Sequence, residues 1–224
     1  MTMNIRYFLL MSFYFQSHFV MSQTANQVLF NDNDNIQKIS KGGGGYLAVI
    51  PIYEGIEGSP VLFEWTPATI VIKGKSSLNG HLVSYDVSRN VFLARVRSQV
   101  LEIDHLRLDT IIVGRMKFVT INDQYFEVIG NGKIPLLKKY TAEVRKPDYI
   151  PALDTGSKVS RWEISNSYFI RYNSALHKVS LSKASIKKEL DLDISFVKEM
   201  ERIGLKFNSA EDLVQILEFL SEKL

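Results

Sequence analysis

Cysteine is absent from the 224 residues of this chain. The absence excludes disulfide bonds, thiolate metal sites, a cysteine nucleophile and the lipid-carrying cysteine of a bacterial lipoprotein. Small exported domains whose apolar core is insufficient often depend on disulfides, so this chain must be stabilised by its core alone. The length is enough for one sizeable core or two small ones.

An excess of charge of either sign is also missing. The chain has 27 Lys and Arg residues against 24 Asp and Glu residues, which gives a formal net charge of +3. So small a charge produces no strong long-range field for a polyanion. We therefore expect no nucleic acid among the partners of this protein.

Long apolar segments are scarce, and the longest lies near the N-terminus. There Arg6 precedes an apolar run from Tyr7 to Phe15, and Val20 and Ser22 occupy the −3 and −1 positions of a small-residue cleavage site. The run is shorter than the roughly 20 residues that a membrane-spanning helix requires. The arrangement predicts a cleaved secretory signal peptide over residues 1–22, in preference to a membrane anchor or a buried helix. We expect an exported protein, in the periplasm, at the cell surface or outside the cell, with no membrane span in the mature chain.

Residues 23–45 are rich in Asn, Asp and Gln and end in four consecutive glycines, Gly42 to Gly45. Glycine has the greatest backbone freedom and no side chain to pack, so this segment is interpreted as a flexible lead. A phosphate-binding loop would require Lys and Ser or Thr after the glycines, followed by a helix. The strand-like run from Tyr46 to Ile50 follows instead.

An antiparallel β-domain is predicted over residues 46–180, because short β-branched and aromatic runs alternate with turn signals. The turn signals are Ser88–Asn90, Asn122–Asp123, Asn131–Gly132, Ser165–Asn166 and Asn173–Ser174. Asn131–Gly132 is the strongest, since both residues tolerate the positive φ of a type I′ hairpin turn. The pattern is typical of an antiparallel sheet, a sandwich or an open barrel. The segment 145–158, with two prolines and a glycine, is either an internal domain boundary or a long loop.

The apolar period changes over residues 181–224, where three short helices are expected at 182–190, 194–203 and 209–223. Gly204 is expected to end the second helix and Ser209 to cap the third. Leucine and isoleucine residues form an apolar stripe along the third helix. The fold class is therefore mainly β (α+β), with a small helical cap at the C-terminus.

Ser59 is a candidate nucleophile by its neighbours, but its surroundings favour a turn. A hydrolase elbow needs Gly-x-Ser-x-Gly between a strand and a helix. Val61 occupies the position of the second glycine, and a strand-like run follows. Pro60 fixes φ and lacks an N–H, which suits the entry to a turn.

A dispersed acid–base site is the alternative to a binding function. Five residues could contribute to a hydrolase site: Asp86, His105, Asp109, Glu127 and His177. At least two of them would have to meet in a cleft to hydrolyse a substrate. No zinc spacing such as H-E-x-x-H is present. We assign no catalytic, metal-binding or cofactor-binding residue and expect no cofactor.

Basic residues form a candidate surface for an anionic ligand. They are Lys133, Lys138, Lys139, Lys183, Lys187 and Lys188. Such a cluster could attract an anionic polymer or a surface lipid. Lys138 and Lys139 are neighbours on a predicted strand and therefore point to opposite faces, which weakens the prediction.

Several segments together resemble a class of exported proteins from Bacteroidetes-type bacteria. They are GSPVL (58–62) with Trp65 after it, LVSYDVSRNVF (82–92), YFEVIGNGKIPLLKKY (125–140), SYFIRYNSALHKVSLSKAS (167–185) and the terminal helix. The signal that ends at Ser22 fits the same source. The resemblance implies a β-domain with C-terminal helices, but it brings no activity and no catalytic residue. We expect an accessory protein that acts by binding or as a structural part, with a partner in the cell envelope.

Overall fold

The structure is a computed structural model that describes residues 55–74, 77–96 and 99–223, together with three short strands nearer the N-terminus. These strands are β1 (Val28–Phe30), β2 (Ile36–Lys38) and β3 (Gly45–Leu47). The predicted signal peptide, residues 1–22, lies outside the described residues. Within the predicted lead, β1 and β2 pair antiparallel. In the described part of the chain, no helix has the length and hydropathy to cross a membrane.

The main sheet has twelve strands and is not closed. Besides β3, its strands are β4 (Ile56–Glu57), β5 (Thr66–Ile72), β6 (Ser77–Asp86), β7 (Val91–Val96), β8 (Gln99–Ile103), β9 (Leu108–Val113), β10 (Met116–Ile121), β11 (Gln124–Gly130), β12 (Leu136–Arg145), β13 (Ser160–Tyr172) and β14 (Ala175–Val179). Their order is β14-β13-β12-β11-β10-β9-β5-β6-β7-β8-β3. The neighbours along this path pair antiparallel, while β4 adds a parallel pair at β13. The predicted mainly β fold with an open sheet is confirmed.

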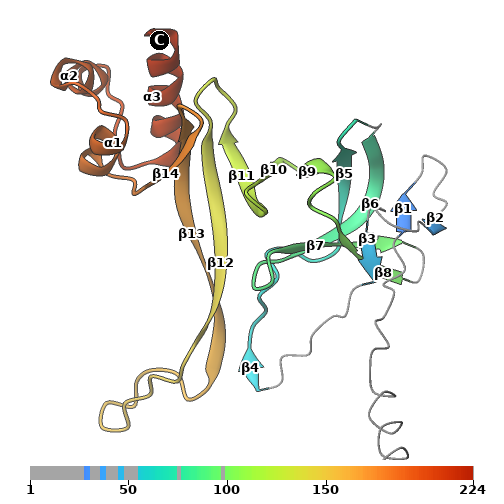
Figure 1. Ribbon diagram of the computed structural model, residues 1–224. Coiled ribbons are helices and arrows are strands. Elements are labelled where there is room, and N and C mark those ends of the chain that lie inside the picture. Colours follow the sequence, from blue (N-terminus) through green and yellow to red (C-terminus); the bar gives the residue numbers. More distant parts are fainter. Residues whose placement is uncertain are drawn as a thin grey trace, which may run out of the picture.

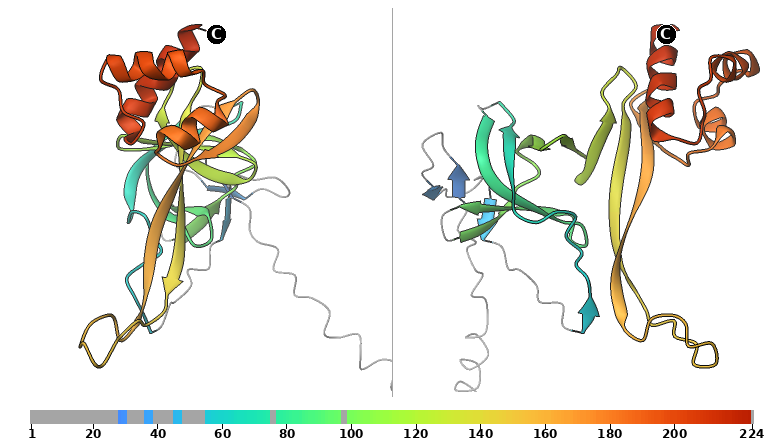
Figure 2. Two further views of the ribbon diagram at one scale, coloured as in Figure 1. Left: turned by 90° about the vertical axis from the view of Figure 1, so that its left-hand side faces the viewer. Right: turned by 180° about the vertical axis from the view of Figure 1, so that it is seen from behind.

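Two hydrophobic cores support the sheet (Figures 1 and 2). Core 1 is formed by strands β5 to β11 and is rich in aromatic rings: Tyr85 stacks on Phe92 with ring centroids 4.5 Å apart. Tyr125 and Phe92 form an edge-to-face pair with ring centroids 4.8 Å apart. Such pairs add to the free energy gained by burial alone. Core 2 lies between β12–β14 and the C-terminal helices, and the long β12–β13 hairpin spans both cores and projects beyond them.

The three predicted helices are confirmed as α1 (Lys183–Glu189), α2 (Ile194–Arg202) and α3 (Ala210–Lys223). The Ser209 hydroxyl caps α3 by accepting a hydrogen bond from the Asp212 amide at 3.0 Å. Gly204 follows α2 with φ of +88°, the left-handed conformation that ends many helices. The predicted cap and stop residues are therefore correct.

The conformation of some predicted turns is set by their local sequence, and that of others is not. Asn122–Asp123 and Asn173–Ser174 have both residues at positive φ, as two-residue hairpin turns require. Asn131–Gly132 does join two paired strands, but neither residue has positive φ. The predicted type I′ turn is wrong, because the connection is the longer loop 131–135, which buries Ile134 in core 2.

The predicted turn at Ser165–Asn166 is also wrong. Strand β13 runs through both residues, which pair with Thr141 and Tyr140 of β12. Pairing along the whole hairpin overrides the local turn preference. His105 lies in the turn between β8 and β9.

The segment 145–158 connects β12 and β13. The two strands that flank it pair from Leu136↔Ile170 to Arg145↔Arg161.

Candidate functional site

The part of the β12–β13 hairpin nearest its loop has an open backbone edge. Strand β12 pairs with β13 along its whole length, but it pairs with β11 only from Leu136 to Lys138. Figure 1 shows β11 diverging from β12 beyond this point. From Lys139 to Arg145, the side of β12 that faces away from β13 has no strand partner within the described residues; we call it the open edge.

Three polar side chains mark the fork where β12 leaves β11. Tyr140 donates its hydroxyl hydrogen to Oε2 of Glu127 at 2.6 Å, and Lys138 Nζ lies 3.7 Å from the same oxygen. Glu127 is buried, with 9% of its surface exposed. Burial, followed by the hydrogen bond to Glu127, raises the pKa of the Tyr140 phenol. The phenol therefore stays protonated, and its hydrogen bond links β12 to β11 at the fork.

The side chains beside the open edge carry more negative than positive charge. Glu143 and Glu163 lie directly opposite each other across β12 and β13, an arrangement in which like charges repel. Arg145 Nη1 lies 3.6 Å from Glu163, while the other terminal nitrogen, Nη2, lies 3.2 Å from Asp148. Glu143 forms no ion pair with any described residue. A pocket of about 360 Å³ is lined by Glu143, Val144, Arg145, Glu163 and Ser165.

The tip of the hairpin is held by its own hydrogen bonds. The Ser157 amide donates to Asp148 Oδ1 at 2.7 Å, and this bond is the main reason that the pKa of Asp148 is lowered. The Tyr149 hydroxyl donates to Asp154 at 2.6 Å. Gly156, at φ of +91°, passes so close to the Asp148 carbonyl that no Cβ would fit. The tip therefore has a defined conformation.

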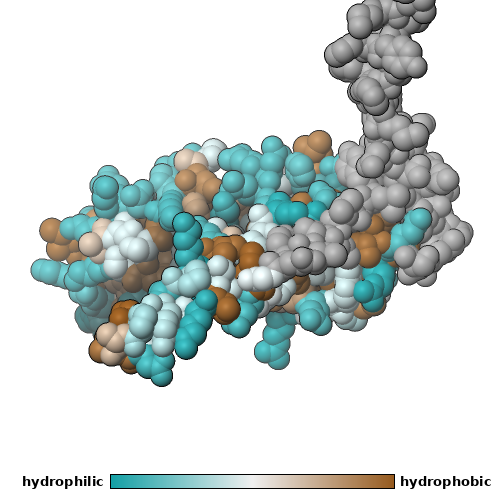
Figure 3. All heavy atoms as spheres, turned by 90° about the horizontal axis from the view of Figure 1, so that it is seen from below, coloured by the Kyte–Doolittle hydropathy of each residue, from teal (hydrophilic) through white to brown (hydrophobic). Residues whose placement is uncertain are grey.

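Apolar side chains are exposed on this ordered tip. Leu153 is 68% exposed and Ile150 is 50% exposed. Figure 3 views the molecule from below, the end to which the hairpin projects, and shows hydrophobic residues at the surface among hydrophilic ones. These two side chains give the tip a small apolar surface.

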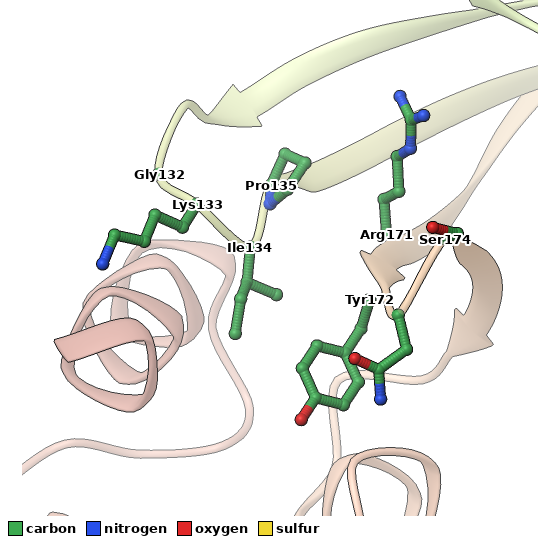
Figure 4. A pocket seen from close by; sticks show the side chains of 8 residues that line it. Gly132, Lys133, Ile134, Pro135, Arg171, Tyr172 and Ser174 are labelled. Atoms are coloured by element: carbon green, nitrogen blue, oxygen red, sulfur yellow. The ribbon is translucent and has the colours of Figure 1, made fainter. Parts of the chain in front are cut away.

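A second candidate site surrounds Arg171, where two pockets share the residues Pro135 and Arg171. The first, of about 470 Å³, is drawn in Figure 4. There Arg171 and Tyr172 point in opposite directions, and Lys133 points toward α3. Lys133 Nζ donates to the carbonyl of Ser221 in that helix at 3.5 Å.

The second pocket, of about 360 Å³, contains three cationic residues, and we call it the cation pocket. It is lined by Lys73, Leu108, Asp109, Thr110, Lys117, Val119, Thr120, Ile121, Val128, Asn131, Pro135, Leu137 and Arg171. Three of these residues are cationic and one is acidic. Sequence reasoning did not single out Lys73, Lys117 or Arg171, because they are far apart in the chain and only the strand order brings them together.

The five candidate hydrolase residues each have different partners. Asp86 accepts from Arg89 Nε at 2.8 Å. His105 Nε2 lies 3.2 Å from Asp123, and His177 Nδ1 lies 3.6 Å from Glu189. Asp109 accepts from the hydroxyl of its neighbour Thr110, and Glu127 accepts from Tyr140.

Among the described residues, no interaction joins two of these five side chains, and Asp109 alone lines one of the pockets described above. The described residues also form no group of three or more carboxylates and histidines that could hold a metal ion. Ser59 accepts a hydrogen bond from the Val61 amide at 3.2 Å, as a turn residue does. The geometry therefore gives no support to the alternative of a hydrolase.

The six candidate lysines are placed on several elements. Lys138 lies beside Glu127 and Lys183 binds Glu201 at 2.7 Å, so both are partly neutralised. Lys187 and Lys188 lie in the last turn of α1, and Lys139 is half-buried on β12. A common anionic-ligand surface of these residues stays a prediction.

Comparison with other proteins adds no relationship: no protein family, curated protein or solved structure matches this chain. The assignment of function is therefore built on the geometry of the hairpin and of the pockets.

Proposed function

We propose that this chain is an exported accessory protein that binds an extended segment of a partner protein along the open edge of β12. The open edge itself carries the proposal. An unpaired strand edge offers alternating N–H and C=O groups that another strand can bind. This edge lies on a projecting hairpin, at the strand positions from Lys139 to Arg145.

The charges on the hairpin define the chemistry of the partner. Glu143 forms no ion pair with any described residue, and it faces Glu163 across the hairpin. A partner strand with lysine or arginine at alternate positions would neutralise both carboxylates. Its intervening apolar residues would contact Val144, which is 39% exposed. The partner segment is therefore basic and apolar in alternation.

A synthetic peptide of alternating lysine and valine residues tests the proposal, with a glutamate–valine peptide as the control for charge. We expect the basic peptide to slow hydrogen exchange of the backbone amides between Lys139 and Arg145 that point away from β13, because added strands bond to these groups. The variant Glu143→Lys should abolish this protection. Glu222→Lys makes the same charge change on the exposed end of α3 and should leave the protection intact.

Two results would contradict the proposal. The first is equal protection by both peptides, since charge would then play no part. The second is protection that maps to another strand, or no protection at peptide concentrations in the millimolar range.

Export to the periplasm or beyond belongs to the same proposal and is supported by the signal-like segment, residues 1–22. The expected cut lies between Ser22 and Gln23. Sequencing the N-terminus of the protein purified from the native cell envelope or medium checks this, with Gln23 as the expected first residue. A cytosolic protein that retains Tyr7 to Val20 would disprove export.

A further inference from the structure

The cation pocket is built across six neighbouring strands of the sheet. In sheet order its lining comes from β13, β12, β11, β10 and β9 and from Lys73, which directly follows β5. Val119 of β10 pairs with Thr110 of β9, so these two side chains share a face. Phe118, the residue before Val119, points into core 1. Leu108, which also lines the pocket, belongs to core 1, so the pocket borders that core.

Cationic charge in this pocket is not neutralised by the described residues. Neither Lys117 nor Arg171 forms an ion pair in the described part of the chain, although Asp109 also lines the pocket. Lys73 donates from Nζ to the carbonyl oxygen of Leu106 at 3.2 Å. That bond holds its ammonium group at the turn between β8 and β9 and leaves its charge uncancelled. Two net positive charges therefore face one hollow, while the whole chain carries only +3.

The floor of the pocket is apolar. Leu108 and Leu137 line it and are each 1% exposed. Val119 and Val128 are half-buried beside them. An inorganic anion has no apolar part that could contact such a floor. A volume of about 360 Å³ instead falls in the range of small-molecule sites, which are usually apolar with a few placed polar groups.

We infer that the cation pocket binds a small organic oxyanion, in which a phosphate, sulfate or carboxylate group is joined to an apolar body. The guanidinium of Arg171 provides the planar donor set that matches an oxyanion in two bonds. Lys73 and Lys117 add charge from the other side. The apolar body lies on Val119 and Val128, the half-buried apolar residues of the lining. This site is independent of the open edge of β12 and of the partner strand proposed for it.

Phenyl phosphate, phenyl sulfate and benzoate are the probes, because they share an apolar ring and differ in the oxyanion. Inorganic phosphate and phenol test the two halves of the ligand separately. We expect at least one ring-bearing anion to bind saturably, and at least tenfold more tightly than either inorganic phosphate or phenol. Amide chemical shifts measured by nuclear magnetic resonance should change in β9, β10 and β13. The ranking of the three anions identifies the preferred group.

Charge reversal provides the matched comparison. Lys117→Glu with Arg171→Glu should raise the dissociation constant at least tenfold, whereas Lys198→Glu together with Arg202→Glu, both exposed on α2, should leave it unchanged. Arg171→Lys keeps the charge but loses the planar donor set, and should raise the dissociation constant by a smaller factor. Because this substitution is conservative, its effect is not explained by misfolding. The inference is overturned if both double variants weaken binding equally, if inorganic phosphate binds as tightly as the ring-bearing anions, or if no probe saturates.

Discussion

Tyr140 donates its hydroxyl hydrogen to the buried carboxylate of Glu127 across the fork between β12 and β11, over 2.6 Å. Phenylalanine at position 140 would keep the ring and remove this bond, leaving Lys138 as the remaining partner of the carboxylate. A hydrogen bond to a charged group contributes about 1.5–3 kcal/mol. We expect Tyr140→Phe to lower the free energy of unfolding by about that amount, as measured by urea denaturation.

Tyr149→Phe is the matched control, because it removes the same atom and the same kind of hydrogen bond from the exposed tip. Bonds between exposed groups contribute little to stability, since water replaces them. A clearly smaller effect is expected here. Equal losses of unfolding free energy in the two variants would show that the bond at the fork contributes no more to stability than the exposed one.

The packing of α3 on β11 leaves no room for a side chain at Gly130. A Cβ there would lie 2.8 Å from Cγ2 and 2.9 Å from Cγ1 of Val214, and the branched valine has little freedom to move in a helix. Gly130→Ala should destabilise the fold by about 1–3 kcal/mol, as overpacking does. Adding Val214→Ala should recover part of the loss, which a double-mutant cycle measures. Additive effects would contradict this contact.

The tip of the hairpin depends on Gly156. Alanine at this position would have to adopt φ of +91° and would clash with the carbonyl of Asp148. We expect Gly156→Ala to speed hydrogen exchange of the Ser157 and Ile150 amides, which are now bonded to Asp148 and Thr155. Gly114→Ala is the control, because it also has positive φ but its Cβ meets no atom within 4 Å. The control should leave exchange at the tip unchanged.

Three tyrosines make stability sensitive to alkali. Burial raises the pKa of Tyr85, Tyr125 and Tyr140 above the ordinary value of 10.0. A raised pKa in the folded state means that the stabilisation is fully present below pH 10 and declines as the pH rises above it. We expect their phenolate absorbance to appear together with unfolding. Ionisation of all three in a folded protein at pH 10 would refute the assignment.

The parts of the fold that sequence predicts are those that neighbouring residues decide. Ser209 and Gly204 mark helix ends through bonds and φ angles of their own segment, and Asn122–Asp123 makes its turn within two residues. Ser165–Asn166 has an equally clear local preference, but its pairing with β12 decides the outcome. Long-range pairing is not written in a short window of sequence, which is why this turn was predicted wrongly.

The candidate sites were less predictable than the fold for the same reason. The run from Lys139 to Arg145 is recognisable as a strand, but its sequence does not reveal that β11 turns away and leaves one side open. Lys73, Lys117 and Arg171 belong to different strands, and only the order β13 to β5 places them around one pocket. The lysines that cluster in sequence include Lys138 and Lys183, which the fold places beside carboxylates.

Core 2 gives the C-terminal helices a role beyond their own packing. Leu136 and Ile170 are fully buried beneath them. A chain that ends at Val179 would keep the long hairpin, but the apolar side chains on one side of it would be exposed to solvent. Sheets of that kind recruit copies of themselves, strand by strand, into aggregates. The helices therefore cover the apolar side of the hairpin, while the open edge of β12 stays accessible for the partner strand that we propose.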